Sequence, residues 1–169
     1  MKKQLKLTLL SCLLSIPAIT QAGPKDDIYR KGWIDFNKNG KMDIYEDPSA
    51  PIEERVKDLL SQMNMDEKTC QMATLYGSGR VLADALPTEK WKSEIWKDGI
   101  GNIDEEHNGL GKFGSEYAFP YAKHVKAIHD IQRWFVEETR LGIPVDFTNE
   151  GIRGVCHEKA TFFPPPPPG

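Results

Sequence analysis

A twelve-residue stretch near the start of the chain has the spacing of a calcium-binding loop. In the EF-hand motif, oxygen ligands come from positions 1, 3, 5, 7, 9 and 12, and a glycine at position 6 allows the sharp turn. The sequence from Asp35 to Glu46 meets this pattern at each position, with Gly40 at position 6. The predicted metal ligands are Asp35, Asn37, Asn39, the backbone carbonyl of Lys41, Asp43 and Glu46.

This loop predicts a structural Ca²⁺ site of modest affinity, because three of its ligands are carboxylates and two are neutral amides. No helix is expected directly before Asp35, so the loop would be isolated rather than part of an EF-hand pair. A solvated turn rich in Asn and Gly is the alternative interpretation. No organic cofactor is expected, since the sequence contains no P-loop, dinucleotide fingerprint or zinc spacing.

Two further groups of polar residues follow predicted strands. Asp104 begins an acidic run that ends at His107, and Glu150 and Arg153 come just after the second predicted strand. In parallel α/β proteins the loops after strands line the ligand site, so these side chains could bind the hydroxyl groups of a sugar. For the run at Asp104, a solvated surface cluster is the commoner arrangement and the favoured interpretation. A structural ion pair is the alternative for Glu150 with Arg153.

The elements that position these residues are helices alternating with short strands. Apolar residues at helical spacing predict a helix after Ser49, which would be its N-cap, and Asn64 would break and recap the chain. A longer helix is expected over residues 120–140, closed by Gly142. The expected apolar faces are Ile52, Val56, Leu59, Leu60 and Met63 in the first helix, and Val125, Ile128, Gln132, Phe135 and Val136 in the long one. Short helices are expected over 65–75 and 88–96, strands over 99–103 and 143–148, and loops over 26–47 and 105–115.

The histidines and cysteines do not form a catalytic pattern. His124 and His129 are five residues apart on the long helix, so they do not share a face, and we take them as ordinary helix residues. Cys156 and His157 are adjacent and face different ways in an extended segment, so a thiol–imidazole pair is not expected. Cys70 and Cys156 either pair in an oxidising compartment or remain two buried thiols.

The first 22 residues have the organisation of a secretory signal peptide. Three lysines precede an apolar stretch from Leu7 to Ile19, which is too short to span a bilayer, and small residues follow at a cleavage site ending at Ala22. A buried N-terminal helix and, through Cys12, a lipoprotein anchor are the alternatives. We therefore expect a periplasmic or extracellular protein. Removing three lysines and no acidic residue lowers the formal net charge from −3 to −6, which argues against nucleic acid as a partner.

The order of strand, long loop, helix and strand is that of a βαβ unit, the building block of parallel sheets. About 70 residues follow the start of the first predicted strand, whereas a barrel of eight βα units needs about 200. The chain closes with Phe162-Phe163, five prolines and Gly169. A proline run favours polyproline II, and we interpret this one as an abnormal end.

Several separate motifs resemble glycoside hydrolase family 3. Residues 54–72 contain ERVKDLLSQM followed by DEK and QM, which is similar to the family opening ERVxDLLSxMTLEEKxxQM. RLGIP at 140–144 resembles the segment that leads into the second barrel strand. EGIRG at 150–154, with ATFFP at 160–164, resembles the stretch D-x-x-H-G … A-T-x-F-P that follows it. The calcium-like loop resembles the leader of secreted members, so the likeness spans residues 35–164.

This resemblance implies an α/β fold: the N-terminal part of a (β/α)8 TIM-like barrel, incomplete here and preceded by the calcium-like loop. It divides the chain into a signal peptide (1–22), a polar leader (23–50), a partial barrel domain (51–164) and a proline tail (165–169). The family consists of retaining exo-acting β-glycosidases, mostly β-glucosidases and β-xylosidases, that act on β-linked oligosaccharides or glycosides. Its nucleophile lies late in the barrel and its acid/base in the following domain, so the resemblance implies no catalytic residue in this chain.

By the same resemblance, Glu150 matches an acidic residue that binds hydroxyls of the sugar in the innermost subsite, and Arg153 stands where many members carry His. Asp104, from its place after the first predicted strand, is the third expected substrate-binding residue. We thus expect the N-terminal portion of a secreted retaining exo-β-glycosidase that is inactive alone. The alternative is a small calcium-stabilised carbohydrate-binding or interaction module. Neither a nucleic-acid partner nor a stable membrane span is expected.

Overall fold

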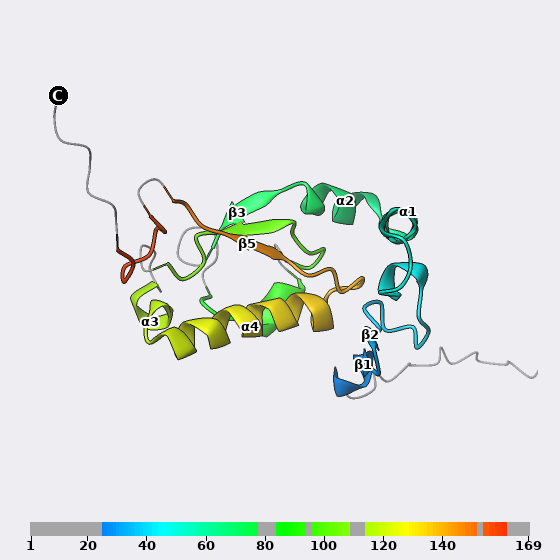
Figure 1. Cartoon of the computed structure of the whole chain (residues 1–169), viewed down its shortest axis with the longest axis horizontal. Helices are drawn as coiled ribbons and strands as arrows, with labels where there is room; N and C mark the ends of the chain where they lie inside the picture. The colour runs from blue at the N-terminus through cyan, green and yellow to red at the C-terminus, as the bar shows by residue number, and fades with distance from the viewer. Residues whose placement is uncertain (1–24, 78–83, 94–95, 109–113, 152–153, 162–169) are drawn as a thin grey trace, which may run out of the picture.

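The computed structural model describes residues 25–77, 84–93, 96–108, 114–151 and 154–161. The predicted signal peptide, the proline tail and Arg153 lie outside these residues. Within them the fold is mixed α/β: a small parallel sheet has a long helix across one face, and a two-stranded hairpin lies near the end of that helix (Figure 1). The described residues form no closed barrel.

Three short strands form the sheet in the order β3–β4–β5, and all of them run parallel. They are β3 (Thr74–Tyr76), β4 (Asn102–Asp104) and β5 (Asp146–Thr148). The expected βαβ unit is confirmed, because β4, the long helix α4 (Tyr121–Glu138) and β5 follow one another and β4 pairs with β5 in parallel.

Strand β3 replaces the last turn of the second predicted helix. That helix, α2 (Met65–Gln71), begins at Asn64 as expected, since the Asn64 side chain accepts a hydrogen bond from a first-turn backbone N–H at 2.8 Å. It ends at Gln71 rather than at residue 75, because the chain turns there to pair with β4. Gly101 permits the turn, since a Cβ at that position would lie 2.3 Å from the carbonyl oxygen of Gln71.

Helix α4 packs an aromatic side against the sheet. Its buried residues are Ala127, Ile131, Trp134, Phe135 and Val136. The Phe135 ring is fully buried, and its centre lies 5.8 Å from that of Trp96 and 5.2 Å from that of Trp134, both in edge-to-face contact. Val125, expected on the buried face, is 65% exposed, so that expectation is wrong. The helix is rotated so that its large aromatic residues are covered, because they remove more apolar surface from water than a valine does.

The first helix, α1 (Ile52–Gln62), keeps its predicted apolar face open. None of its residues is buried, and Ile52 is 72% exposed. The face borders a groove whose other walls include Phe36, Tyr45, Ile143 and Pro144. The expected N-cap is also wrong, because the Ser49 hydroxyl donates to the Asp47 carboxylate and Pro51 occupies the N-cap position.

Three shorter segments differ from the sequence-based expectations. The helix expected over 88–96 is a single 3-10 turn, η3 (Glu89–Lys92), anchored by the buried Trp91. The short helix α3 (Gly114–Ala118) begins inside the predicted loop 105–115. The predicted loop 26–47 contains two 3-10 turns and an antiparallel hairpin, namely η1 (Lys25–Ile28), β1 (Tyr29–Arg30), β2 (Trp33–Ile34) and η2 (Ile44–Glu46).

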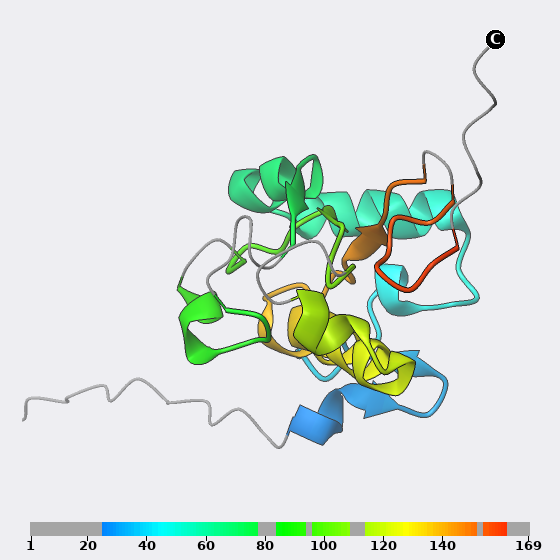
Figure 2. The same ribbon diagram turned by 90° about the vertical axis from the view of Figure 1, so that its left-hand side faces the viewer.

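The polar leader is fastened to the C-terminal end of α4. Lys38 has a left-handed backbone conformation (φ 60°), and its ammonium group donates hydrogen bonds to the carbonyl oxygens of Val136 and Thr139. Carbonyls at a helix C-terminus lack intrahelical partners and attract a positive charge. The Tyr29 hydroxyl also donates to the Glu137 carboxylate at 2.9 Å. Both views accordingly place the hairpin beside α4 (Figure 2).

Replacing Lys38 by Met is expected to destabilise the fold, because two carbonyl oxygens at the end of α4 lose their charged donor. We expect the free energy of unfolding to fall by about 1–3 kcal/mol, the usual range for a hydrogen bond to a charged group. Urea denaturation followed by far-UV circular dichroism measures this loss. Lys31→Met, at an exposed position of the hairpin turn, is the control and should change stability by less than about 0.5 kcal/mol. Equal losses in the two variants would contradict the capping role of Lys38.

Candidate functional site

The carboxyl ends of β3, β4 and β5 meet at one edge of the sheet, and polar residues gather there. The residues directly after β4 are Glu105, Glu106, His107 and Asn108, and the loop that starts at Asn149 follows β5. Because α4 runs back between two parallel strands, α3 and the first turn of α4 lie at this same edge. Figure 1 shows α3 and the loop after β5 at this end of the molecule.

The sheet has one apolar face and one polar face. Leu75, Ile103 and Phe147 belong to the core beneath α4, and alternate residues of each strand point the other way. The polar residues of β4 and β5 are linked by hydrogen bonds between Thr148 Oγ1 and Asp104 Oδ1 (2.9 Å), Thr148 Oγ1 and Asn102 Oδ1 (3.1 Å), and Asn102 Nδ2 and Asp146 Oδ2 (3.3 Å). Asp104, one of the predicted substrate-binding residues, therefore lies on the polar face at the carboxyl edge.

The residues after Asp104 are buried, although a solvated cluster was the favoured interpretation of the sequence. Glu105, Glu106, His107 and Asn108 are each less than a tenth exposed. Glu105 and His107 both have a backbone φ of 53°, a conformation that side chains of this kind rarely adopt. Such strain persists only where the surroundings enforce it, and it is common at functional sites. The solvated interpretation is thus wrong for Glu105, Glu106 and His107.

Three backbone hydrogen bonds hold the buried segment in place. The N–H of Glu105 donates to the carbonyl of Thr148 at 3.0 Å, and the N–H of Glu158 donates to the carbonyl of Asn108 at 2.9 Å. The N–H of Gly77 donates to the carbonyl of Asp104 at 2.9 Å. The segment is therefore bonded to the ends of both neighbouring strands.

Gly77 is also the reason that Glu106 fits at this edge. A Cβ at position 77 would lie 2.2 Å from Glu106 Oε2 and 2.9 Å from the Cα of Glu106, well inside van der Waals contact. A glycine directly after a strand can mark a close approach of a neighbouring backbone. The sequence predicted a helix over 65–75 instead of β3, so this signal was not recognised and the buried position of Glu106 was missed.

Glu150 is exposed in the loop after β5. Its carbonyl accepts a hydrogen bond from the N–H of Cys156 at 2.8 Å, and the Asn149 side chain donates to the Cys156 carbonyl at 2.8 Å. These bonds close the loop at its base and leave the carboxylate of Glu150 on the outside. The predicted pairing of Glu150 with Arg153 remains a prediction, since Arg153 lies outside the described residues.

Three histidines from different segments come together beside this edge. The ring centres of His107 and Tyr117 are 4.9 Å apart, and those of His124 and His157 are 5.6 Å apart. A ring nitrogen of His124 lies 3.2 Å from the carbonyl oxygen of Tyr117. Sequence reasoning took His124 for an ordinary helix residue and did not anticipate these contacts, because His107 and His157 are distant from it in the chain.

Burial controls the charge of these rings. It lowers the pKa of His107 from its ordinary value of 6.5 to about 4, although Glu106 Oε1 lies 3.1 Å from His107 Nε2. Burial also lowers the pKa of His124. A neutral imidazole costs less to bury than an imidazolium, so both rings are neutral near pH 7.

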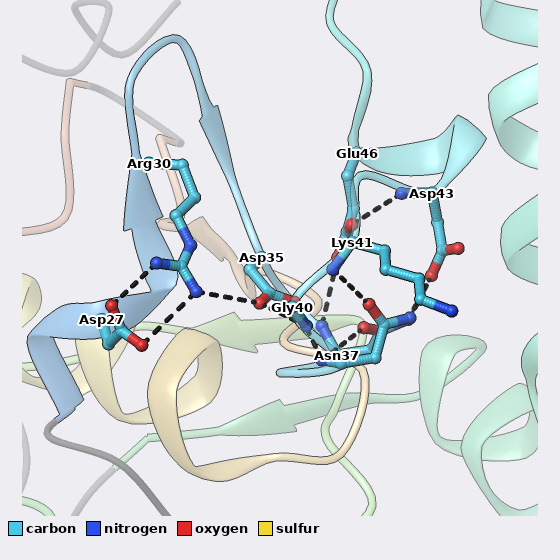
Figure 3. A network of polar contacts seen from close by, with 9 residues as sticks. Asp27, Arg30, Asp35, Asn37, Gly40, Lys41, Asp43 and Glu46 are labelled. Atoms are coloured by element: carbon cyan, nitrogen blue, oxygen red, sulfur yellow. Dashed lines mark hydrogen bonds and ion pairs between the residues drawn. The ribbon is translucent and has the colours of Figure 1, made fainter.

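The second predicted site is the loop from Asp35 to Glu46 (Figure 3). Asp35 is 2% exposed, and its two carboxylate oxygens accept hydrogen bonds from the N–H groups of Asn39 (3.0 Å) and Gly40 (2.8 Å). The side chain of Arg30 lies 3.8 Å from the same carboxylate. Asp35 therefore fixes the turn at Gly40, whose φ of 78° suits a glycine.

Glu46 and Asp43 close the other half of the loop. The two oxygens of the buried Glu46 carboxylate accept from the N–H groups of Asn37 (3.2 Å) and Asp43 (2.9 Å). Asp43 Oδ2 accepts from the side-chain amides of Asn37 (2.5 Å) and Asn39 (2.8 Å). Within the described ranges, no group of three or more His, Cys, Asp or Glu side chains lies in an arrangement that could hold a metal ion. The predicted calcium site thus remains a prediction.

The described residues also bear on the cysteines and on membrane-spanning helices. Within the described residues, neither Cys70 nor Cys156 forms a disulfide; both are partly buried, and burial raises the pKa of the Cys70 thiol. None of the described helices is long and apolar enough to cross a bilayer.

Acidification is expected to destabilise the fold through His107. The folded-state pKa of about 4 lies below the usual value of 6.5, so the unfolded chain binds a proton that the native chain resists. The free energy of unfolding should therefore decrease as the pH falls from about 6.5 towards 4.5. Urea denaturation at several pH values measures this slope, which His107→Gln should flatten. His129→Gln, on the exposed side of α4, should leave the slope unchanged. An unaltered slope in the His107 variant would contradict the assignment of this pH dependence to His107.

Comparison with known proteins shows that part of the chain is similar in sequence to a protein with a glycosidase name. No family model matches it. A protein of Formosa agariphila with the name "Putative beta-xylosidase" is 32% identical over 122 residues, which is 70% of this chain and 15% of that protein. The chain thus spans about a seventh of the length of the curated relative that it matches. The similarity supports a glycosidase-related region and does not extend to the remainder of that protein.

Proposed function

We propose that the chain supplies the N-terminal part of a secreted retaining exo-β-glycosidase of glycoside hydrolase family 3. The similarity to the beta-xylosidase-named protein carries this proposal. The family motifs in residues 54–72 and 140–164 support it, and so does a parallel sheet with polar residues at its carboxyl edge. In this proposal β3, β4 and β5 belong to a (β/α)8 barrel, and residues 1–22 direct the protein to the periplasm or the exterior.

The two faces of the sheet fit the barrel proposal. In a barrel of this type the helices surround the outside and the ligand site lies at the carboxyl ends of the strands. Here α4 covers the apolar face, and the face opposite to it carries Asn102, Asp104 and Thr148. The polar face would then line the interior, with Asp104 at the rim where a substrate enters.

The substrate-binding role rests on carboxylates at two adjacent strand ends. Asp104 and Thr148 are register partners on β4 and β5, and Glu150 comes two residues after Thr148. Ionised carboxylates accept hydrogen bonds from sugar hydroxyls, and the guanidinium of Arg153 would donate to them. We therefore propose that Asp104, Glu150 and Arg153 bind one sugar unit of a β-linked oligosaccharide or glycoside.

Glycosidic cleavage with retention needs a nucleophilic carboxylate and an acid/base about 5 Å apart. By the family resemblance, neither residue belongs to the stretch matched here. The 169-residue chain should therefore bind a sugar and leave β-glycosides intact.

Sugar binding and turnover by the 169-residue chain test this proposal together. Nuclear magnetic resonance titration with xylose should shift the amide signals of Asp104 and Glu150. Glu150→Gln should weaken binding about tenfold, because a charged acceptor contributes about 1.5–3 kcal/mol. Glu158→Gln, on the exposed side of the same loop, is the matched control.

Two outcomes would contradict the proposal. Xylose binding that does not depend on Glu150 would remove the substrate role, and hydrolysis of 4-nitrophenyl β-xyloside or β-glucoside would remove the statement about the catalytic residues. A xylose affinity that stays unchanged when the rest of a barrel is supplied in trans would instead favour the small carbohydrate-binding module.

We also propose that the loop from Asp35 to Glu46 binds Ca²⁺ as a structural ion. The buried carboxylates of Asp35 and Glu46 are already held at the two ends of the loop by backbone N–H groups. The amide groups of Asn37 and Asn39 point their nitrogens at Asp43. Reversing each amide would exchange the hydrogen bonds that its oxygen accepts from the N–H groups of Asn39 (3.1 Å) and Lys41 (2.7 Å) for an oxygen ligand that suits a hard cation.

Calcium is expected to raise the thermal unfolding temperature of the chain, because an ion that binds only the native state stabilises it. Differential scanning calorimetry with excess CaCl₂ or with a chelator measures the increment. Asp35→Asn and Glu46→Gln should abolish the increment, even though both also lower the basal stability. Lys41→Ala should keep it, because Lys41 would contribute only its backbone carbonyl. An increment of the same size in all variants would refute the site.

A further inference from the structure

Two aromatic rings are exposed side by side near the carboxyl edge of the sheet. Phe119 is 49% exposed and Tyr121 is 55% exposed, and their ring centres are 5.6 Å apart at an angle of 80°. They flank Pro120, at the junction between α3 and α4. In the described part of the chain, no other ring-to-ring contact joins two aromatic side chains that are both exposed to this extent.

The ring pair is continuous with the candidate site. The loop of residues 154–161 lies against it: the His157 ring is 6.0 Å from the Tyr121 ring, and the Lys159 ammonium is 5.7 Å from the centre of the Phe119 ring. The same loop is hydrogen-bonded through Glu158 to Asn108, the last residue of the buried segment after β4. The N–H of Cys156, next to His157, donates to the carbonyl of Glu150 at 2.8 Å, so the loop that contacts the rings is also bonded to a proposed sugar-binding residue.

The chemistry of the surface suits a sugar ring. A pyranose has an apolar face of C–H groups and a rim of hydroxyls, so it needs a flat apolar surface with polar groups beside it. The rings of Phe119 and Tyr121 lie at 80° to each other, so the flat face of one ring can stack on the sugar while the other ring borders its edge. The Lys159 ammonium and the Tyr121 hydroxyl offer hydrogen-bonding groups at the border. Ligand sites commonly combine such an aromatic lining with a few polar groups.

We propose that Phe119 and Tyr121 form a subsite that stacks a second sugar unit of an oligosaccharide. This unit would be linked to the one bound by Asp104 and Glu150. The inference rests on the proposed function for its ligand class, and it assigns a place for the neighbouring sugar. It also assigns the loop of residues 154–161 the role of holding the rings in position.

The test compares xylose with xylotriose on the 169-residue chain, since only the trisaccharide can reach both places. In titrations followed by nuclear magnetic resonance, xylotriose should bind about three- to tenfold more tightly than xylose. Tyr121→Leu and Phe119→Leu keep an apolar side chain but remove the ring, so each should reduce or abolish this gain and leave xylose affinity unchanged. Val125→Ala, at an exposed position one turn further along α4, is the control and should preserve the gain.

The outcomes separate this inference from the proposed function. Equal affinity for the two sugars, or a gain that survives both leucine variants, would overturn the stacking subsite and leave the roles of Asp104 and Glu150 intact. Binding of xylotriose that depends on Tyr121 but not on Glu150 would support the subsite and overturn the proposed function. Absence of binding to either sugar would overturn both. Far-UV circular dichroism of each variant confirms that the exposed substitutions leave the fold unchanged.

Discussion

The burial of the aromatic side of α4 against the sheet determines where every polar group of the candidate site lies. Phe135 and Ile131 cover the strands, and Leu75, Ile103 and Phe147 meet them from the other side. Because side chains alternate along a strand, this burial directs Asn102, Asp104 and Thr148 to the opposite face. A shift of one residue in the pairing of β4 with β5 would exchange the two faces, so the register is fixed by the apolar contacts.

At the carboxyl edge the same packing produces crowding. The chain leaves β4 with two residues in left-handed conformations, Glu105 and His107, and Glu106 fills the space that a side chain at Gly77 would take. Such conformations cost free energy, which the hydrogen bonds to Thr148 and Glu158 help to offset. A surface loop would have no need of this arrangement. The backbone strain at Glu105 and His107 is consistent with the proposed binding role of the carboxyl edge, which needs acidic side chains in fixed positions.

The sequence was sufficient for features encoded by neighbouring residues. The long helix, the capping of α2 by Asn64 and the parallel pairing of β4 with β5 follow from periodicity, capping chemistry and the βαβ order. Features that depend on contacts between residues distant in the chain could not be predicted from the sequence. The three residues of β3 continue a helical pattern, and only pairing with β4 makes them a strand. The rotation of α4 depended on which rings the sheet could cover.

The candidate site shows the same division. Asp104 could be placed at the edge of the sheet because it follows the predicted strand over 99–103, and the loop at Asp35 could be proposed as a calcium site because its ligand spacing is local in the chain. The burial of Glu106 and His107 depended on Gly77, and the contact of His124 with His157 depended on the loop after β5. Those pairs are separated by tens of residues. Each depends on tertiary packing, which one sequence does not reveal.

The tether between Lys38 and the end of α4 has a consequence for how the chain responds to damage. The Val136 and Thr139 carbonyls that it caps lie only a few residues before β5, whose pairing defines one border of the site. A cut in the leader would release the last helical turn, and the disturbance would pass along residues 139–145 into that strand. A leader segment that is distant from β5 in the sequence would then help to hold that strand in its place in the sheet.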